Sequence, residues 1–267
     1  MAEPSTAEGR TALEAIAADP ERALIASDFD GTLAAIVPEP ADARGFPGAA
    51  AALAALAKKA GTVAIITGRP AADAVALGGF EGVDGLIVLG HYGAERWQDG
   101  TVTAAPVPEG VAVVRAELPA VLAAASAPEG TRIEDKGTAL AVHTRQAADP
   151  QGTLDRLREP VGRLAEQTGL TVEPGRFVLE IRPAGTDKGG ALRQLVREHG
   201  ARSVVFCGDD LGDLPAFAAL RELRAEGVPG CAVASRSPES PQVAEAADLV
   251  VDGPAGIVAF LSSLLPA

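Results

Sequence analysis

Short apolar runs that alternate with helical patterns limit the fold of this chain more than any other feature. Each run has the length of a β-strand and is almost entirely apolar: ALIAS (23–27), TVAIIT (62–67), GLIVLG (85–90), SVVFCGD (203–209), CAVAS (231–235) and DLVV (248–251). Strands that are apolar on both faces and separated by helices are typical of a parallel sheet covered by helices on both sides. The sequence therefore predicts an α/β fold built on a Rossmann-like parallel sheet.

One of the helices expected between these strands has clear end signals. Residues 48–61, GAAAALAALAKKAG, combine strong helix formers with two lysines near the end and a final glycine. Cations stabilise the C-terminal end of a helix, and glycine commonly follows its last turn. We expect this helix to carry Lys58 and Lys59 in its last turn and to end at Gly61.

The middle of the chain has a different pattern, in which a helix is twice followed by a pair of strands. The helices are expected at about 109–125 and 151–168, and the strand pairs are TRIEDK with TALAVHTR and LTVEPG with RFVLEIRP. Pro106, Pro108 and the stretch that starts at Pro183 are typical of hinges. The sequence predicts one domain from residues 1–105 and 185–267, with a small α/β domain, residues 106–184, inserted into it.

Composition argues against several classes of protein. Hydrophobic residues make up 47% of the 267 residues, which excludes a disordered chain. The net charge of −13 argues against nucleic acid or an anionic membrane as a partner. No stretch approaches the roughly 18 apolar residues of a membrane span, and the start lacks the pattern of a signal peptide. We expect a cytoplasmic protein with reduced, buried Cys207 and Cys231. The lack of a heptad seam or apolar surface stripe favours a monomer.

Two aspartates follow directly after the first apolar run, in ALIASDFDGTL. Residues two apart in an extended chain point their side chains the same way, so we expect the carboxylates of Asp28 and Asp30 to crowd together. Such a pair at the end of a buried strand is unfavourable unless a cation compensates it. A solvated Asx-type turn is one interpretation of this pattern, and a cation site with a chemical task is the other.

Two further motifs favour the binding of an anion. In IITGR, Thr67 offers a hydroxyl and Gly68 lets backbone N–H groups approach a ligand. In GTDKGGAL, Thr186 or Asp187 is expected to cap a helix whose first turn contains Lys188. Because the helix dipole disfavours a cation in that turn, this lysine is either solvent-facing or, as we favour, bound to a phosphate.

Three more aspartates follow the fourth apolar run, in FCGDDLGDL. Because ligands of parallel sheets bind beyond the carboxyl ends of the strands, Asp209, Asp210 and Asp213 are expected at the same edge as Asp28. Several carboxylates together are typical of a hard cation, and Mg²⁺ suits a few carboxylates with phosphate oxygens and water. The sequence predicts a magnesium site at this edge.

The order of these motifs resembles the haloacid dehalogenase (HAD) superfamily of aspartyl-phosphate enzymes over nearly the whole chain. The motifs are DFDGT, the Thr67 turn, Lys188 and the Asp209-Asp210 pair. The resemblance implies that Asp28 is the nucleophile and that Asp30 protonates the leaving alcohol and then activates water. It also implies that the inserted domain is an α/β cap of the larger, C2 type, which reads the leaving group.

The same resemblance implies roles for the other site residues. The implied magnesium ligands are Asp28, Asp30 through its carbonyl, Asp209 and Asp210. The implied catalytic groups on the phosphoryl oxygens are Thr67 and Lys188, and Gly68 and Arg69 are expected to bind the substrate. Thr32 and Asp213 are expected to support the ligands.

Alternation along the strands of the inserted domain places charged residues on one face and apolar residues on the other. The residues expected on the polar face are Glu134, Lys136, His143, Arg145, Glu180 and Arg182. Ion pairs on a solvated sheet would explain this face, and so would a site for a hydroxyl-rich ligand such as a sugar.

Three segments also resemble the trehalose-6-phosphate phosphatase family: GHYGAE, the E-x-K…H-x-R hairpin and the EIRP…KG run. The resemblance implies a magnesium-dependent phosphatase that converts trehalose 6-phosphate to trehalose and phosphate, with a small sugar phosphate as its partner. The implied sugar-binding residues are Glu134, Lys136, His143, Arg145 and Glu180. The last family motif, GDD-x-TDE, differs here, because Gly212 replaces the threonine and Leu214 replaces the acid.

Other functions also fit these motifs. The chain could hydrolyse another sugar phosphate, such as sucrose phosphate or a mannosyl phosphate, or isomerise one as a phosphomutase. A catalytically silent regulator that binds a sugar phosphate is a third class. The presence of Asp28, Asp30, Lys188 and Asp209 favours catalysis.

Overall fold

The computed structural model describes residues 3–104, 106–175, 177–183, 187–237 and 240–265. The chain divides into two compact units, one formed by Met1–Ala104 and Asp187–Ala267 and the other by Ala105–Thr186. The expected domain boundaries at 105–106 and 184–185 adjoin or include residues outside the described part of the chain, as does the proposed helix cap Thr186. We describe each unit by itself.

Among the described residues, the larger unit contains an eight-stranded sheet in the order β12-β11-β10-β1-β2-β3-β4-β5. Its strands are β1 (Ala23–Ser27), β2 (Thr62–Ile66), β3 (Leu86–Gly90), β4 (Glu95–Gln98), β5 (Thr101–Ala104), β10 (Ser203–Gly208), β11 (Gly230–Ser235) and β12 (Leu249–Val251). All pairs from β12 to β3 are parallel. The α/β fold with a central parallel sheet is therefore confirmed, and each strand predicted for this unit lies within one or two residues of its expected position.

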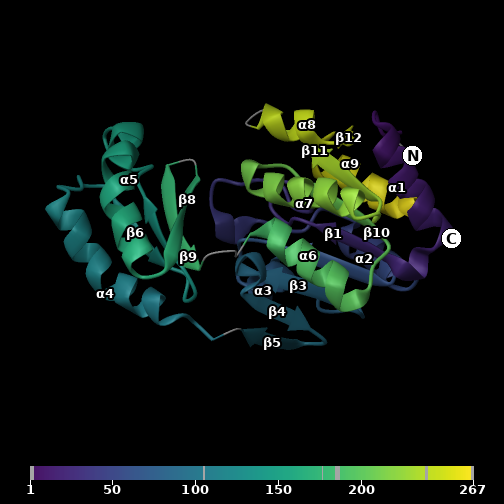
Figure 1. The fold of residues 1–267 in the computed structure, drawn as a ribbon, viewed down its shortest axis with the longest axis horizontal. Coiled ribbons are helices and arrows are strands. Elements are labelled where there is room, and N and C mark those ends of the chain that lie inside the picture. The colour runs from purple at the N-terminus through teal and green to yellow at the C-terminus, as the bar shows by residue number, and fades with distance from the viewer. Residues whose placement is uncertain (1–2, 105, 176, 184–186, 238–239, 266–267) are drawn as a thin grey trace. The chain divides into compact units, whose positions relative to one another are not determined.

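Helices cover both faces of this sheet, as Figure 1 shows for α6 and α7 on one face. The helices are α1 (Ala7–Ala18), α2 (Ala49–Ala57), α3 (Ala71–Gly78), α6 (Lys188–His199), α7 (Leu214–Ala225), α8 (Pro241–Ala246) and α9 (Gly253–Leu264). One apolar core joins the sheet to α1, α2, α3 and α9, and a second joins it to α6, α7 and α8. Two cores explain why the strands are apolar on both faces.

The structure corrects the expected end of the second helix. Helix α2 ends at Ala57, with Lys58 as its C-cap, so it has no basic residue in its last turn. Gly61 does not close the helix. Its N–H donates to the Pro20 carbonyl, and a Cβ on Gly61 would lie 2.2 Å from the carbonyl oxygen of Glu21. The glycine is needed for this close backbone approach at the start of β2.

A hairpin that the apolar pattern did not predict extends the sheet beyond β3. Strands β4 and β5 pair antiparallel to β3 and to each other. They are joined by Asp99 and Gly100, which both have positive φ angles of 50° and 77°. An Asp-Gly pair with two positive φ angles is typical of a type I′ hairpin turn. That dipeptide was the sequence signal for the hairpin.

The smaller unit combines two helices with a four-stranded antiparallel sheet among its described residues, in the order β6-β7-β9-β8. Its elements are α4 (Glu109–Ala124), β6 (Arg132–Asp135), β7 (Leu140–His143), α5 (Pro150–Gln167), β8 (Leu170–Gly175) and β9 (Val178–Pro183). Leu140, Val142, Leu179 and Ile181 pack with both helices in one apolar core. The other face of the sheet carries mostly polar residues, together with Ala141 and Val178, as alternation predicts.

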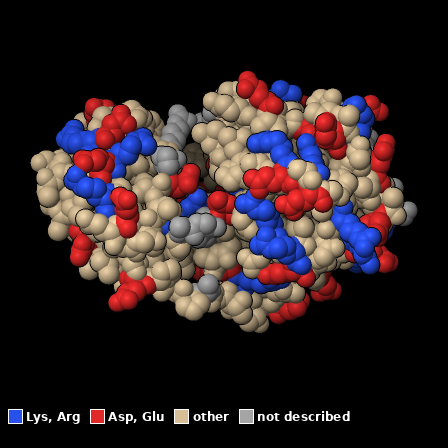
Figure 2. Space-filling model, viewed as in Figure 1, with Lys and Arg blue, Asp and Glu red and all other residues tan. Residues whose placement is uncertain are grey.

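Charged side chains are mixed on the visible surface of each unit. In Figure 2, Lys and Arg are interspersed with Asp and Glu, without a continuous basic patch on the face shown. None of the helices in the described part of the chain is both long and apolar enough to cross a membrane.

Candidate active site

The predicted acidic residues of the larger unit come together at the carboxyl ends of β1 and β10, two neighbouring parallel strands. Asp28 directly follows β1, and its N–H donates to the carbonyl of Cys207 in β10. Asp209 directly follows β10. Lys188 opens α6, which is capped by the Asp187 side chain. Lys188 and Asp209, which lie 160 and 181 positions after Asp28, thus meet it at the carboxyl ends of the strands, as expected for a parallel sheet.

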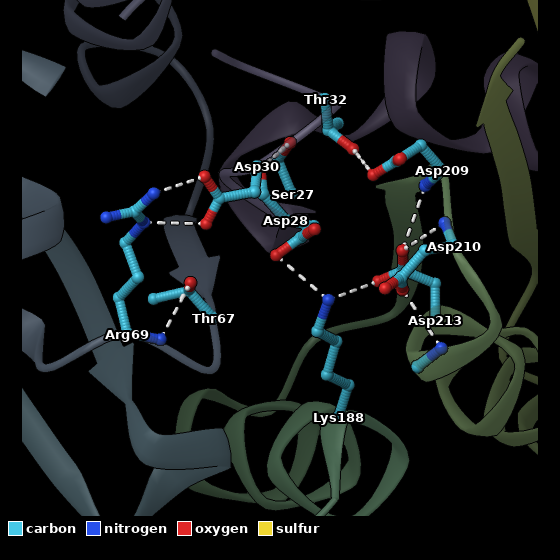
Figure 3. A network of polar contacts seen from close by, with 11 residues as sticks. Ser27, Asp28, Asp30, Thr32, Thr67, Arg69, Lys188, Asp209, Asp210 and Asp213 are labelled. Carbon is cyan, nitrogen blue, oxygen red and sulfur yellow. Dashed lines mark hydrogen bonds and ion pairs between the residues drawn. The ribbon is translucent and has the colours of Figure 1, made fainter. Parts of the chain in front are cut away.

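Lys188 is buried between two carboxylates, as Figure 3 shows. Its Nζ lies 2.9 Å from Oδ1 of Asp28 and 2.7 Å from Oδ1 of Asp213, and the three side chains are at most 6% exposed. The solvent-facing interpretation of Lys188 is therefore wrong. A lysine in the first turn is accommodated here because two carboxylates offset the unfavourable helix dipole.

Asp213 organises the loop after β10. Its Oδ2 accepts hydrogen bonds from the backbone N–H groups of Asp209 and Asp210, while its Oδ1 accepts one from Lys188. Both oxygens of this fully buried carboxylate are therefore engaged. The loop conformation that presents Asp209 is fixed by these bonds, since a buried carboxylate is stable only with such partners.

The Asp209 carboxylate is held against the loop that follows Asp28. Thr32 Oγ1 donates to Oδ1 of Asp209 at 3.1 Å. A Cβ on Gly31 would lie 2.0 Å from Oδ2 of Asp209, and Gly31 has a φ angle of 74°. Only glycine fits here, both for its backbone conformation and for the close contact with the carboxylate.

Crowding and burial strongly perturb these carboxylates. Burial raises the pKa of Asp28 well above its ordinary value; Lys188 opposes this shift, and Asp213 and Asp209 add to it. Burial, with the charges of Asp213 and Asp210, raises the pKa of Asp209 to about 8. Burial alone would lower the pKa of Lys188, but Asp213 and Asp28 outweigh it and raise that pKa. One lysine does not compensate all these carboxylates.

The donor set fits a divalent cation. Asp28, Asp209 and Asp213 each offer an oxygen within 4.8 Å of the others. Oxygen-only ligands and uncompensated negative charge are what Mg²⁺ requires. Asp210 differs from the others, since it is exposed and its side chain accepts a hydrogen bond from the N–H of Gly212. Both oxygens of Asp213 already accept hydrogen bonds. Among the described residues of this cluster, Asp28 and Asp209 are therefore the better candidates to hold a cation.

Asp30 pairs with Arg69, and its carboxylate does not crowd against that of Asp28. The prediction of two crowded carboxylates was wrong in this respect. Arg69 Nε and Nη2 donate to the two oxygens of Asp30, both at 2.7 Å. Figure 3 shows the Asp28 carboxylate turned toward Lys188 and the Asp30 carboxylate turned toward Arg69. Because β1 ends at Ser27, the extended-chain rule no longer applies to residues 28–30.

Arg69 is held from several sides. Its Nη1 donates to the Pro40 carbonyl, and its guanidinium lies 5.7 Å from the centre of the Phe29 ring. Its backbone N–H donates to the Thr67 hydroxyl. The expected substrate-binding arginine is thus engaged with Asp30, in the planar two-point geometry that favours an arginine–carboxylate pair.

The turn that contains Thr67 and Gly68 is supported by a strained segment after β3. His91, Tyr92 and Gly93 have successive positive φ angles of 47°, 58° and 103°. The N–H of Tyr92 donates to the Thr67 carbonyl, and that of His91 to the Arg69 carbonyl. The Tyr92 hydroxyl lies so close to Gly68 that a Cβ there would be 2.7 Å from it. The resemblance of the GHYGAE segment to a family motif predicted neither this contact with the Thr67 turn nor the strained backbone of His91 and Tyr92.

The polar face of the smaller unit brings four of its predicted residues into two pairs. Lys136 Nζ lies 2.7 Å from Oε2 of Glu180, and His143 Nε2 lies 2.7 Å from Oε2 of Glu134. Arg145 is exposed beyond the end of β7. The two pairs confirm the face that alternation predicted for Glu134, Lys136, His143 and Glu180. The place of Arg145 on this face stays a prediction.

Comparisons with known proteins agree with these motifs. The family model described as Trehalose-phosphatase matches residues 26–255. A trehalose-phosphate phosphatase of Mycolicibacterium paratuberculosis is 34% identical over 251 residues, covering 89% of this chain and 60% of that protein. A Mycobacterium tuberculosis protein described as an uncharacterized glycosyl hydrolase is 36% identical over 252 residues, covering 89% of this chain and 18% of that protein. The chain thus spans less than two thirds of these relatives.

Solved structures show the same fold. The C-terminal domain of a Candida albicans trehalose-6-phosphate phosphatase aligns with a TM-score of 0.77 at 21% identity, covering 98% of this chain and 97% of that one. A haloacid dehalogenase-like hydrolase from Bacteroides thetaiotaomicron aligns with a TM-score of 0.65 at 18% identity, covering 91% and 99%. With a family model that extends over most of its length, the chain belongs to the trehalose-phosphatase family, on a HAD-like fold.

Proposed function

We propose that this chain is a magnesium-dependent phosphatase that hydrolyses trehalose 6-phosphate to trehalose and phosphate through an aspartyl-phosphate intermediate. The observation that carries the proposal is the buried Asp28 carboxylate, paired with Lys188 and close to Asp209. A nucleophile, a cation for the phosphoryl group and a metal ligand are thereby present at one point. Family membership supports the reaction class and the substrate.

The first step transfers the phosphoryl group to the protein. An oxygen of Asp28 forms a bond to phosphorus while the bond from phosphorus to the sugar oxygen breaks, and Asp30 gives a proton to that oxygen. Lys188 and the Thr67 hydroxyl stabilise the charge on the phosphoryl oxygens. In the second step Asp30 takes a proton from water, whose oxygen bonds to phosphorus as the bond to Asp28 breaks.

The residues proposed to hold magnesium are Asp28, Asp209 and the carbonyl of Asp30, with Asp210 at the rim. Magnesium, when bound, would neutralise phosphoryl charge and help to align the group with Asp28. Burial, reinforced by the neighbouring carboxylates, raises the pKa values of Asp28 and Asp209. This supports the assignment, because a bound cation would stabilise their ionised forms.

Arg69 is better supported as the partner of Asp30 than as a direct substrate ligand. Its two hydrogen bonds to Asp30 fix the orientation of the carboxylate that transfers protons in both steps. A proton-transfer group must be positioned within hydrogen-bond reach of the reacting oxygen, which gives this ion pair a catalytic purpose.

We assign the smaller unit, with proposed limits 106–184, the role of a C2-type cap whose polar face binds the sugar. The proposed sugar-binding residues are Glu134, Lys136, His143, Arg145 and Glu180. Paired acids and bases can exchange their mutual hydrogen bonds for bonds to sugar hydroxyls. A cytoplasmic monomer remains our prediction for the protein.

The test is phosphate release from a panel of sugar phosphates, with magnesium and with EDTA. We expect trehalose 6-phosphate to have the highest kcat/KM, free trehalose as the sugar product and no turnover in EDTA. A higher kcat/KM for sucrose phosphate or a mannosyl phosphate would overturn the substrate. Isomerised sugar phosphate would indicate a mutase, and tight binding without turnover would indicate a regulator.

A further inference from the structure

A buried serine from a strand outside the acidic cluster contacts the loop that follows Asp28. Ser235 ends β11, which is separated from β1 by β10. It is only 2% exposed, and its Oγ donates a hydrogen bond of 2.7 Å to the carbonyl of Gly31, 204 positions away in the sequence. This bond connects the loop after β1 to a strand that is not its neighbour in the sheet.

The Gly31 carbonyl is a sensitive place for such a bond. It belongs to the peptide that joins Gly31 to Thr32, so its orientation sets the positions of both residues. On one side, the Gly31 Cα lies against Oδ2 of Asp209, where a Cβ would be 2.0 Å away. On the other side, Thr32 Oγ1 donates to Oδ1 of Asp209. Both oxygens of Asp209 are thus contacted by the dipeptide whose carbonyl Ser235 holds.

The other end of the same loop is also fixed. The N–H of Gly31 donates to the Ala34 carbonyl at 2.7 Å. Gly31 has a φ angle of 74°, a backbone conformation that residues other than glycine rarely adopt. With the N–H and the C=O both bonded, the peptide planes on the two sides of Gly31 are determined. Of these two bonds, only the one from Ser235 ties the loop to another part of the sheet.

We propose that Ser235 is a positioning residue for the divalent cation: by holding the Gly31 carbonyl, it keeps the Asp209 carboxylate oriented for metal binding. The inference rests on the proposed magnesium site, although it does not depend on the identity of the sugar. Residues that orient a metal ligand without touching the metal commonly change metal affinity. Ser235 is therefore expected to affect magnesium binding before it affects the chemical steps.

The experiment compares Ser235→Ala with Ser203→Ala. Ser203 is a matched control, because it is also 2% exposed and belongs to the same sheet. It is the first residue of β10 and therefore lies at the amino-terminal ends of the parallel strands, away from the acidic cluster. The dissociation constant of Mg²⁺ is measured by calorimetry on each metal-free protein. The magnesium dependence of p-nitrophenyl phosphate hydrolysis is measured in parallel. Thermal melting establishes that each variant is folded.

We expect Ser235→Ala to raise the magnesium dissociation constant about tenfold, the lower end for outer-shell substitutions. The half-saturating magnesium concentration should rise by a similar factor, and kcat at saturating magnesium should stay close to that of the parent. Ser203→Ala should leave the dissociation constant unchanged. Ser235→Cys, which keeps the size but donates more weakly, should give an intermediate value, and it carries the test if the alanine variant does not fold.

An unchanged dissociation constant in Ser235→Ala would overturn the inference, as would an equal rise in Ser203→Ala. A loss of kcat that saturating magnesium does not restore would also overturn it. Failure of the proposed function is distinguishable: a protein that binds magnesium in this serine-dependent way but hydrolyses no sugar phosphate would retain the inference and lose the activity. A parent protein that does not bind magnesium would overturn both.

Discussion

One ion pair of the larger unit and one of the smaller unit lie in opposite environments. In the larger unit, the side chains of Lys188 and Asp28 are 4% and 6% exposed. In the smaller unit, those of His143 and Glu134 are 38% and 48% exposed. Buried pairs interact strongly and cannot exchange partners with water, whereas exposed pairs are weak and replaceable. Lys136 and Glu180, at 21% and 11% exposed, lie between these extremes. Under the proposed function, the buried charges serve the chemical step, and the Glu134–His143 pair is the most adaptable part of the sugar site.

The largest expected effect comes from the centre of the buried network. Asp28→Asn keeps the shape of the side chain but replaces the nucleophilic carboxylate with a neutral amide, so kcat should fall at least about 10⁴-fold for every phosphate ester. Phosphate release and acid trapping of the phosphorylated protein measure the effect. The variant should also bind magnesium more weakly than the parent, because Asp28 is a proposed magnesium ligand. Measurable phosphoenzyme in Asp28→Asn would contradict the assignment.

The pair of Asp30 and Arg69 is more exposed than the pair of Asp28 and Lys188, and its variants should have smaller effects. Asp30→Asn should lower kcat for trehalose 6-phosphate by about 10²–10⁴-fold, the contribution of a general acid and base. With p-nitrophenyl phosphate the first step should persist, because nitrophenolate leaves without a proton. Rapid-quench measurements should therefore show a burst of nitrophenol followed by slow turnover.

Arg69→Met should give the same pattern to a smaller degree, because Asp30 loses its two hydrogen bonds but remains present. Arg69→Lys is the control, since it keeps the charge and loses the planar two-point geometry. An equal fall in kcat/KM for both substrates, caused by a raised KM and without a nitrophenol burst, would instead indicate that Arg69 binds the substrate directly.

In the smaller unit, Lys136→Met should raise KM for trehalose 6-phosphate about 10- to 100-fold, because hydrogen bonds to charged groups contribute about 1.5–3 kcal/mol. Hydrolysis of p-nitrophenyl phosphate, which has no sugar, should not change. Arg163→Gln, which alters an exposed ion pair on α5, is the matched control. Equal losses with both substrates would show that the polar face is not a sugar site.

The pH dependence of stability should differ between metal-free and magnesium-bound protein. The folded-state pKa of Asp209, about 8, lies above its ordinary value of 3.8, so the folded state holds a proton that the unfolded state releases. Stability from this group is complete at low pH and is lost as pH rises toward 8. The melting temperature in EDTA should therefore fall between pH 5 and pH 8, and magnesium should raise it most at pH 8. Asp209→Asn should make the melting temperature in EDTA depend less on pH. An equal rise in melting temperature with magnesium at pH 5 and pH 8 would contradict the prediction.

The smallest expected effect comes from the exposed pair. Glu134→Gln should change the free energy of unfolding by no more than about 1 kcal/mol, because solvent screens the interaction with His143. Urea unfolding at low and high salt measures this. Lys188→Met, in contrast, leaves buried carboxylates without a partner and should cost about 3–5 kcal/mol. A similar loss of unfolding free energy in both variants would contradict the difference between the buried and the exposed ion pair.

Much of the fold could be predicted because its signals are local. Each buried strand of the parallel region is a continuous apolar run, and alternation placed Glu180 and Leu179 on opposite faces of the small sheet. The β4–β5 hairpin was not predicted, because β4 is only partly buried and β5 is exposed, so neither strand has an apolar pattern. The Asp99-Gly100 turn was its only clear signal.

The sequence by itself determined which groups are available for chemistry and at which ends of strands they lie, because strand ends and helix starts follow from local patterns. The partners of those groups were decided by the tertiary structure. Asp28 pairs with Lys188, Asp30 with Arg69, and Ser235 with Gly31, over separations of up to 204 residues. Such pairings depend on strand order and on turns that end the extended backbone, and neither is encoded in the spacing of the residues.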